Sequence, residues 1–325
     1  MVNTLRDLIA PFLRPIADLI DDPSISEVMV VQTAHVFVER NGRIEALPEI
    51  RLTEVKLTAA AKHIARWHHE EIGPDRPLLD ARLEDGSRVA IAVPPASVDG
   101  ITLTIRKFAG RRYTARELVA LGTLTEPMLT SLEAAMVARE NVLISGGTAT
   151  GKTTMLNALT ALLPHHERIV LIEDTAEISL PHPHLVRFEA HHDDQCSITI
   201  RDLVRASLRH RPDRLIIGEV RGPEAFDLLQ ALNTGHSGTL TTIHANSART
   251  AVTRLASCVL TAGEHLPHEA ILAHIADSIR YLLHLTRRDR LRYACELVRL
   301  EGYQFGTGQF AFTTLHTHAP QEAHA

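Results

Sequence analysis

The chain is poor in cysteine and in long apolar runs. Its 325 residues contain three cysteines, Cys196, Cys258 and Cys295, and no two of them form a C-x-x-C pair. This usage argues for a reducing compartment and against a structural zinc site. No apolar run approaches the roughly 20 residues that cross a bilayer, and the first residues lack the basic and apolar regions of a signal peptide. We therefore expect neither a spanning helix nor a secreted chain.

An excess of charge of one sign is also missing. The formal net charge of −5 gives no general basic surface for a nucleic acid. A basic cluster does occur at 106–113, but four charges are too few to indicate DNA binding. The phosphates of a bound nucleotide, or plain solvent exposure, are alternative roles for it. We expect no direct sequence-specific contact with nucleic acid.

The sequence does contain a change of periodicity near residue 110. Before it, an amphipathic pattern predicts a helix over 4–20, for which packing on a core is favoured over docking on a membrane or partner. Further helix and strand patterns follow at 28–32, 35–39, 53–71, 77–83, 88–94 and 101–106, with turns at Asn41-Gly42 and Asp85-Gly86. After it, helices and strands alternate, which predicts a parallel sheet covered by helices. The fold class is therefore α/β, with a small α+β domain at 1–105, a linker at 106–118 and a larger domain at 119–325.

A phosphate-binding loop is the most specific signal in the larger domain. Residues 146–154 fit the pattern G-x-x-x-x-G-K-[ST], between an apolar strand pattern and a helix pattern. Glycines let several backbone N–H groups converge on phosphate oxygens, and the positive end of the helix adds to them. The predicted nucleotide-binding residues are Gly146, Gly147, Thr148, Ala149, Thr150, Gly151, Lys152, Thr153 and Thr154. Lys152 can reach the outer phosphates and the Thr153 hydroxyl can ligate Mg²⁺. The sequence thus predicts a nucleoside triphosphate site, and a glycine-rich turn without a ligand is the alternative.

Two later strand patterns end in acidic residues. The first ends in Glu173 and Asp174, shortly before Glu177, and the second contains Glu219, shortly before Arg221. The carboxyl ends of parallel strands face the crevice where α/β proteins bind ligands. We expect Glu219 to activate the attacking water as general base and to hold the metal through water, with Glu173 as the second catalytic candidate. Capping of the following turn is the alternative for Asp174 and for Glu219.

Two histidines flank the next strand pattern. His236 and His244 bracket a Gly- and Thr-rich stretch that should run beside the strand of the phosphate loop. A histidine near the γ-phosphate can sense that group through a hydrogen bond. His244 therefore joins the catalytic candidates, and ordinary core packing is the alternative for both histidines.

Together these stretches resemble the secretion-traffic ATPase superfamily of type II and type IV secretion. The order of the Gly-rich loop, I-E-D-T-A-E, R-P-D-R-L-I-I-G-E-V-R-G-P-E-A and N-T-G-H-S-G-T-L-T-T-I-H-A-N is similar to its Walker A, Asp, Walker B and His boxes. One departure is Gly218, which stands where many P-loop enzymes place a metal-binding Asp. In the spacing of its two histidines and in its lack of a four-Cys insert, the chain is most similar to the TrbB-type conjugal-transfer ATPases of type IV secretion.

The resemblance implies a fold, an activity and partners. It implies a RecA-like P-loop ATPase domain that uses ATP and Mg²⁺ in a homo-hexameric ring. The ring would lie in the cytoplasm, peripheral at the inner membrane, and would work with inner-membrane components of a type IV secretion or mating-pair machine. Hydrolysis would power pilus assembly or substrate transfer in conjugation. The resemblance also implies that arginines of the first domain and linker approach the nucleotide, with Arg88, Arg106 and Arg112 as candidates.

Three other functions compete with this one. A pilus assembly or retraction ATPase, of the type IV or tight-adherence kind, would share the same engine. A DNA-translocating ATPase is less favoured, since basic or aromatic pore loops are not evident in the sequence. A nucleotide-sensing regulator that does not hydrolyse ATP is disfavoured by the intact Lys152, Thr153 and Glu219.

Overall fold

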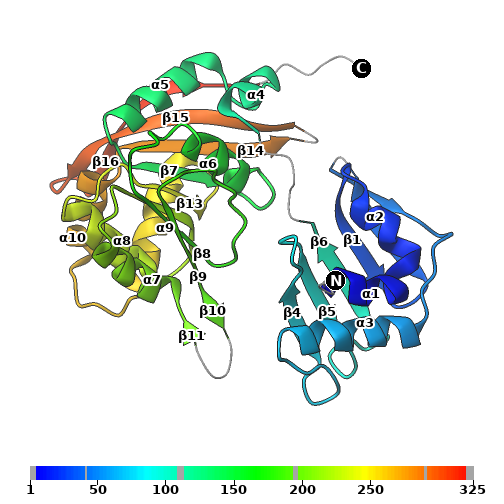
Figure 1. Ribbon diagram of the computed structural model, residues 1–325. Helices are drawn as coiled ribbons and strands as arrows, with labels where there is room; N and C mark the ends of the chain where they lie inside the picture. The colour runs from blue at the N-terminus through cyan, green and yellow to red at the C-terminus, as the bar shows by residue number, and fades with distance from the viewer. Residues whose placement is uncertain (1–4, 41, 108–112, 193–196, 289–290, 320–325) are drawn as a thin grey trace. The chain divides into compact units, whose positions relative to one another are not determined.

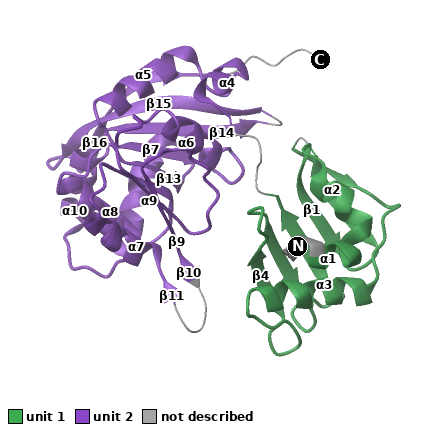
Figure 2. Ribbon diagram, in the orientation of Figure 1, with its two compact units in different colours: residues 1–111 green, residues 112–325 purple. Residues whose placement is uncertain are grey.

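The chain divides into two compact units, residues 1–111 and residues 112–325 (Figure 2). The computed structural model describes residues 5–40, 42–107, 113–192, 197–288 and 291–319. The predicted turn residue Asn41 and the candidate Arg112 lie outside the described residues. Among those residues, no helix is both long enough and apolar enough to span a membrane.

The first unit is a six-stranded antiparallel sheet with helices packed on one face (Figure 1). Its strands follow the order β3-β2-β1-β6-β5-β4. Its elements are α1 (Leu5–Leu13), the 3-10 turn η1 (Arg14–Ile16), α2 (Ala17–Asp21), β1 (Ile25–Val31), β2 (His35–Arg40), β3 (Arg43–Ala46), α3 (Glu54–Trp67), β4 (Leu78–Arg82), β5 (Arg88–Ala92) and β6 (Thr102–Arg106). The predicted α+β character is confirmed, and the helix predicted over 4–20 is broken into three short segments.

The amphipathic face of the first helix packs on the core of this unit. Ile9, Leu13 and Ile16 are at most 2% exposed, and the Phe12 ring stacks on the ring of His63 of α3 at 5.1 Å. Burial of such side chains contributes about 1.5 to 3 kcal/mol each. The prediction that this helix packs on a core is therefore confirmed.

The second unit is built on an eight-stranded sheet in the order β16-β15-β14-β7-β13-β12-β8-β9. The strands from β14 to β9 are parallel to their neighbours, as predicted. Its helices are α4 (Ala115–Ala120), α5 (Glu126–Val137), α6 (Lys152–Thr160), α7 (Ile200–Ser207), the 3-10 turn η2 (Leu208–His210), α8 (Glu224–Asn233), α9 (Ala248–Leu260) and α10 (His268–Ser278). Its strands are β7 (Val142–Gly146), β8 (Ile169–Glu173), β9 (Leu185–Glu189), β10 (His191–His192), β11 (Ser197–Ile198), β12 (Arg214–Val220), β13 (Leu240–His244), β14 (Tyr281–Arg288), β15 (Leu291–Gln304) and β16 (Gln309–Thr317).

Helices cover both faces of the parallel strands (Figure 1). Successive residues of a strand point to opposite faces, so Ile144 of β7 joins the core with α5 and α6, while Leu143 joins the core with α8, α9 and α10. A strand buried on both faces is apolar throughout, which explains the continuous hydrophobic run that precedes the phosphate loop.

The last two strands depart from the predicted alternation. No helix separates β14, β15 and β16, and each of these strands pairs antiparallel with the next. They extend the sheet beyond β14, which itself pairs parallel with β7. The phosphate-loop strand is therefore central in the sheet, between β13 and β14.

Candidate nucleotide site

The predicted phosphate loop forms the tight turn between β7 and α6. Ala149 has a φ of 58° and Gly151 a φ of 95°, and such left-handed residues turn successive N–H groups toward one concave side. Gly146 is needed for another reason, because a Cβ atom there would lie 2.6 Å from the backbone oxygen of Leu285 on β14. The loop therefore has the backbone geometry of an anion-binding turn at the start of a helix.

The threonines of the loop differ in their surroundings. Thr150 is buried, and its hydroxyl donates to the carbonyl of Gly147 at 2.9 Å. Thr148 is exposed, while Thr153 and Thr154 are half-buried on the first turn of α6. Thr150 thus closes the loop on itself, and the other three hydroxyls are accessible from outside the core.

Lys152 folds back over the loop that precedes it. Its Nζ atom donates to the carbonyl oxygens of Gly146 at 3.1 Å and Gly147 at 2.9 Å, and the residue is only 7% exposed. Burial lowers the pKa of this lysine, and the charge of Arg221 lowers it further, while Glu219 opposes them. The ammonium is therefore held at the loop by backbone dipoles.

Glu219 is directed by an irregularity in its strand. Ile217 pairs with Thr241 of β13, but the next pair joins Val220 to Ile243, so β12 carries one extra residue there. Such a bulge reorients the side chains around it and is common beside active sites. The Glu219 side chain is 18% exposed and reaches the neighbourhood of the phosphate loop.

Gly218 fits the same irregularity. A Cβ atom at this position would lie 3.3 Å from Cγ of Glu173 on β8, which is tight for any larger side chain. Its carbonyl accepts a hydrogen bond of 2.7 Å from the Thr242 hydroxyl. An Asp at this position would therefore require the Glu173 side chain to shift by a few tenths of an ångström.

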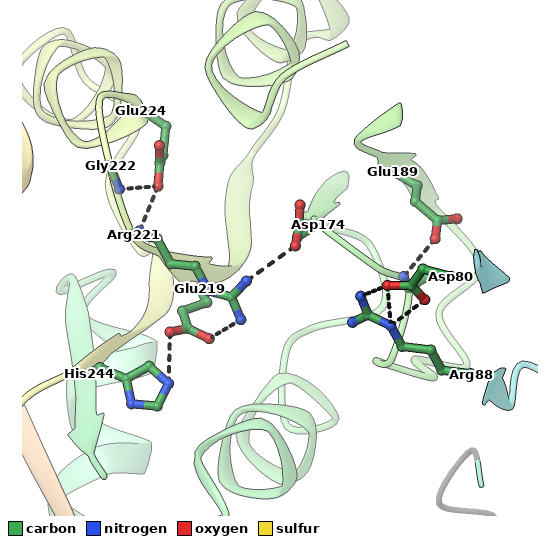
Figure 3. Close-up of polar contacts among 10 residues, drawn as sticks. Asp80, Arg88, Asp174, Glu189, Glu219, Arg221, Gly222, Glu224 and His244 are labelled. Carbon is green, nitrogen blue, oxygen red and sulfur yellow. Dashed lines mark hydrogen bonds and ion pairs between the residues drawn. The ribbon is translucent and has the colours of Figure 1, made fainter. Parts of the chain in front are cut away.

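His244 lies between the lysine and the glutamate. Both ring nitrogens are 3.4 Å from Nζ of Lys152, and Nε2 is 3.0 Å from Oε1 of Glu219 (Figure 3). The second contact lacks hydrogen-bond geometry, because Oε1 accepts no hydrogen bond from the described residues. Burial lowers the pKa of His244, helped by the charge of Lys152 and opposed by Glu219. A neutral ring therefore separates the cation from the carboxylate.

Arg221 connects the two acidic strand ends. One of its nitrogens lies 3.0 Å from Oε2 of Glu219, and another lies 3.2 Å from Oδ2 of Asp174 (Figure 3). The guanidinium thus holds one oxygen of Glu219, while the other oxygen faces His244. The structure therefore brings Asp174, Glu219 and Arg221 together at the ends of β8 and β12.

Glu173 has a different environment from Glu219. It is 3% exposed, and its Oε1 atom accepts from the backbone N–H groups of Glu177 at 2.8 Å and Ile178 at 2.7 Å. Arg187 lies 3.5 Å from Oε2. Burial raises the pKa of Glu173, and these donors oppose that rise. The Glu173 carboxylate thus holds the following loop, a capping role that the sequence analysis had considered for Asp174, and Glu177 contributes its backbone N–H while its side chain remains exposed.

The other predicted residues lie away from this cluster. His236 is at the opposite end of the segment from His244, where its Nδ1 atom is 3.2 Å from the carbonyl of Ala231 at the end of α8. Arg88 and Arg106 belong to the first unit, where Arg88 donates to Asp80 of β4. The approach of these arginines to a nucleotide stays a prediction.

A pocket adjoins the phosphate loop on the side of α9. Its volume is about 480 Å³, and it is lined by Gly147, Thr148, His244, Ala245, Asn246, Thr250 and Arg254. None of these lining residues is acidic, which suits an anionic ligand. Arg254 was not predicted, because it lies two turns into α9 and no local pattern distinguishes it from a solvated helix residue.

Glu224 is a second residue that the sequence analysis did not assign to the site. It is 5% exposed, and its Oε1 atom accepts from the N–H groups of Arg221 at 2.6 Å and Gly222 at 2.8 Å (Figure 3). The Gly-Pro-Glu sequence after the strand could have indicated the position of Glu224, since an acidic residue is favoured in the first turn of a helix. Glu224 therefore fixes the backbone from which the Arg221 side chain extends.

Replacing Glu224 should destabilise this corner of the site. In Glu224→Ala the backbone N–H groups of Arg221 and Gly222 lose their acceptor. This loss should lower the free energy of unfolding by about 1 to 3 kcal/mol. Urea denaturation followed by circular dichroism measures the change. The matched control is Glu269→Ala, an exposed acid in the first turn of α10, which should cost under about 0.5 kcal/mol. Equal losses in the two variants would show that Glu224 has no special bracing role.

Known proteins share this sequence and fold. The family described as type II/IV secretion system protein matches residues 12–304. The conjugal transfer protein TrbB of Rhizobium radiobacter is 32% identical over 288 residues, which cover 88% of this chain and 86% of that protein. The type IV secretion system protein VirB11 of Brucella suis biovar 1 is 33% identical over 289 residues, covering 80% of each chain. The X-ray structure of the Legionella pneumophila ATPase DotB has a similar fold, with a TM-score of 0.62 at 19% identity over 85% of this chain and 76% of that one. The family match covers most of the residues that form both units, including the whole cluster around Lys152. The chain therefore belongs to the type II/IV secretion system protein family and is an ATPase.

Proposed function

We propose that this chain is a hexameric motor ATPase of a conjugative type IV secretion system, peripheral to the cytoplasmic face of the inner membrane. The observation that carries the proposal is the continuous contact from Lys152 through His244 to Glu219 at the ends of parallel strands. This cluster belongs to a chain that is 32% identical to a conjugal transfer protein over most of its length. Its work would be pilus assembly or substrate transfer, together with inner-membrane components of the machine.

The phosphate loop would bind the triphosphate of ATP. The N–H groups of residues 147–152 would hold the phosphate oxygens, and the Lys152 ammonium would exchange its two loop carbonyls for the outer phosphates. The half-buried Thr153 hydroxyl, with Glu219 through water, fits Mg²⁺, which takes most of its ligands from water and substrate phosphates. Mg²⁺ would supply neutralisation of the charge on the phosphates. Among the described residues no group of three or more His, Cys, Asp or Glu could form a separate metal site.

Glu219 would act as the general base toward the attacking water. Arg221 holds its Oε2 atom at 3.0 Å, while Oε1 is buried and accepts no hydrogen bond from the described residues. A carboxylate oxygen with an available lone pair can accept the proton of a water molecule as it attacks phosphorus. This geometry supports Glu219 over Glu173, whose Oε1 atom already accepts two backbone N–H groups.

His244 would report the state of the terminal phosphate. Its neutral ring contacts both the ammonium that binds the phosphate and the carboxylate that activates water. Loss of the phosphate would therefore change both contacts, and a change of this kind can shift a two-state element. In this proposal the moving element is the first unit, joined through residues 106–118.

We expect His244→Ala to bind ATP within about threefold of wild type and yet to lose the response to its hydrolysis. The readout is fluorescence energy transfer between labels on the two units, with a non-hydrolysable ATP analogue and then with ADP. The matched control is His236→Ala, at the other end of the same segment, where the ring Nδ1 atom lies 3.2 Å from the carbonyl of Ala231 on α8. A full wild-type change of transfer efficiency in His244→Ala would show that this histidine is not the reporter.

The arginines of the first unit would complete the site in a ring. Arg88 and Arg106 stand directly opposite each other on β5 and β6, and each already faces a carboxylate, because Arg88 donates to Asp80 and Arg106 is the register partner of Glu27 on β1. In a ring, Arg88 and Arg106, together with Arg112, would exchange such contacts for nucleotide phosphates, a role that rests on the resemblance to the family. A ring seen by mass photometry with ATP would support the hexamer.

Deletion of the gene tests the biological role. The proposal predicts that donor cells without the chain lose plasmid transfer and recover it when the wild-type gene is supplied. If the chain were a pilus retraction motor, its deletion would instead leave pili on the cell and abolish twitching. If it were a DNA-translocating ATPase, its turnover would be stimulated by DNA. Normal plasmid transfer from the deletion strain would contradict the conjugative role.

A further inference from the structure

A buried polar pair lies directly before the phosphate loop. Ser145 of β7 and His284 of β14 are register partners in the parallel pairing, and Oγ of Ser145 is 2.9 Å from Nδ1 of His284. Ser145 is fully buried and His284 is 6% exposed. Both residues interrupt strands whose neighbouring positions are apolar and buried. Burying a polar group costs free energy unless it is hydrogen-bonded, and these two side chains satisfy each other.

One side of the pair leads to Lys152. Ser145 is followed at once by Gly146, whose carbonyl accepts from Nζ of Lys152 at 3.1 Å. Gly146 also lies so close to the backbone of Leu285 that no side chain fits between them. The end of β7 is therefore fixed on β14 at two successive residues, Ser145 and Gly146. The position of that end determines where the carbonyl groups that accept from the Lys152 ammonium lie.

The other side of the pair leads to α9. Glu296 of β15 is the register partner of His284, and its Oε1 atom accepts from the N–H group of Ala248 at 3.0 Å. Ala248 is the first residue of α9, four residues after His244. His284 thus stands between the strand that carries the phosphate loop and the strand that holds the segment following His244.

Few charges reach His284. Those of the described residues that act on it are Lys152 of α6 and Glu296 of β15, and the nearby Cys295 thiol stays neutral because burial raises its pKa to about 11. Burial lowers the pKa of His284, the charge of Lys152 lowers it further, and Glu296 opposes both. The ring is therefore neutral near pH 7, and its protonation would place a second cation close to the ammonium of Lys152.

We propose that His284 is a positioning residue of the ATPase site, which through Ser145 fixes the carbonyls that orient Lys152. The proposal rests on the ATPase activity of the chain and adds a buried residue that acts through Ser145. It explains why a histidine stands between the buried residues Leu283 and Leu285 of β14. It also predicts that discrimination between ATP and ADP, which depends on the outer phosphate, is the property most sensitive to this pair.

The test is the ratio of ATP to ADP affinity, measured by calorimetry on the full chain. His284→Leu and Ser145→Ala should each lower this ratio by about tenfold, which is the scale of one lost buried hydrogen bond. His284→Asn, whose amide can replace Nδ1, should stay within about threefold of wild type. The Ser145→Ala/His284→Leu double variant should be no worse than His284→Leu alone, because the two side chains act as one unit.

A second Ser–His pair in the same unit gives a matched control. Oγ of Ser131 on α5 is 2.8 Å from Nε2 of His316 on β16, away from the phosphate loop. His316→Leu removes the same kind of bond and should leave the ratio unchanged. If His284→Leu and Ser145→Ala lowered only the thermal midpoint and left the ratio at the wild-type value, the pair would be mere packing and the proposal would be wrong.

The pH profile is an independent readout. Because burial lowers the pKa of His284, the wild-type ratio should fall on the acid side of the ordinary histidine range, where His284 takes up a proton, and the His284→Asn ratio should not show that part of the fall. His244 is present in both proteins, so the difference between the two profiles isolates His284. Identical profiles would contradict the proposal. A wild-type chain without any affinity for ATP would instead contradict the ATPase function on which it rests.

Discussion

Lys152→Ala should reduce ATP turnover by at least about 100- to 1,000-fold, the scale of losing one electrostatic contact to a developing charge. The loss follows from position, since the ammonium lies over the loop carbonyls and 3.4 Å from both ring nitrogens of His244. No alanine atom can reach the outer phosphates from that place. Affinity for ATP should fall as well, whereas affinity for ADP should fall less. Phosphate release measured at saturating ATP gives the rate.

The control for this variant is Lys56→Ala. Lys56 is exposed on α3 of the first unit, so its removal changes the net charge by the same amount and leaves the residues of the phosphate loop intact. We expect wild-type turnover from it. Comparable losses in the two variants would mean that turnover depends on overall charge, and the assignment of Lys152 would then be wrong.

Glu219→Gln should keep ATP binding and slow hydrolysis by roughly a hundredfold or more, the scale lost with a general base. Glutamine preserves the shape and can still bond to Arg221, but it cannot accept a proton from water. Single-turnover hydrolysis with pre-bound ATP separates this step from binding. An unchanged rate would transfer the base role to Glu173.

Glu173→Gln is the matched comparison. A glutamine there can still accept the two backbone N–H groups of Glu177 and Ile178 with its remaining oxygen, so the loop should keep its conformation. We expect a loss of less than about tenfold, well below that of Glu219→Gln. The ranking of the two variants, more than either value, decides which carboxylate activates water.

Local sequence patterns were sufficient for the elements that carry the site. The phosphate loop, the strand before it and the two acidic strand ends were predicted because each is specified by adjacent residues with a defined backbone requirement. The parallel order followed from helices alternating with strands. The prediction that the strand of His244 runs beside the phosphate-loop strand is confirmed by the pairing of β13 with β7.

The direction of side chains could not be predicted in the same way. The bulge in β12 places Val220 opposite Ile243 and so decides where Glu219 points, yet nothing in the strand sequence marks the extra residue. Likewise the sequence analysis named His244 as a catalytic candidate but could not place the two rings, and the structure puts His244 at the carboxyl end of β13 beside Lys152 and His236 near the end of α8. Register between strands, and not local propensity, fixes both outcomes.

Contacts between distant parts of the chain also could not be predicted from the sequence. Ser145 and His284 are 139 residues apart, and their bond depends on β14 entering the sheet beside β7. The sequence analysis predicted no such strand, so it could not identify a partner for Ser145. For Ser145 and for His284, the sequence shows only a polar residue between apolar neighbours.

The most direct measurement for the whole account is plasmid transfer from donor cells whose chain carries Glu219→Gln. The variant should be present at the wild-type level and should bind ATP, because only the proton acceptor has changed. The account predicts that transfer falls by several orders of magnitude, to the level of the deletion strain, and that the variant also suppresses transfer when produced beside the wild-type chain in mixed rings. Wild-type transfer frequency from cells that contain only Glu219→Gln would contradict the claim that ATP hydrolysis at this site drives the machine.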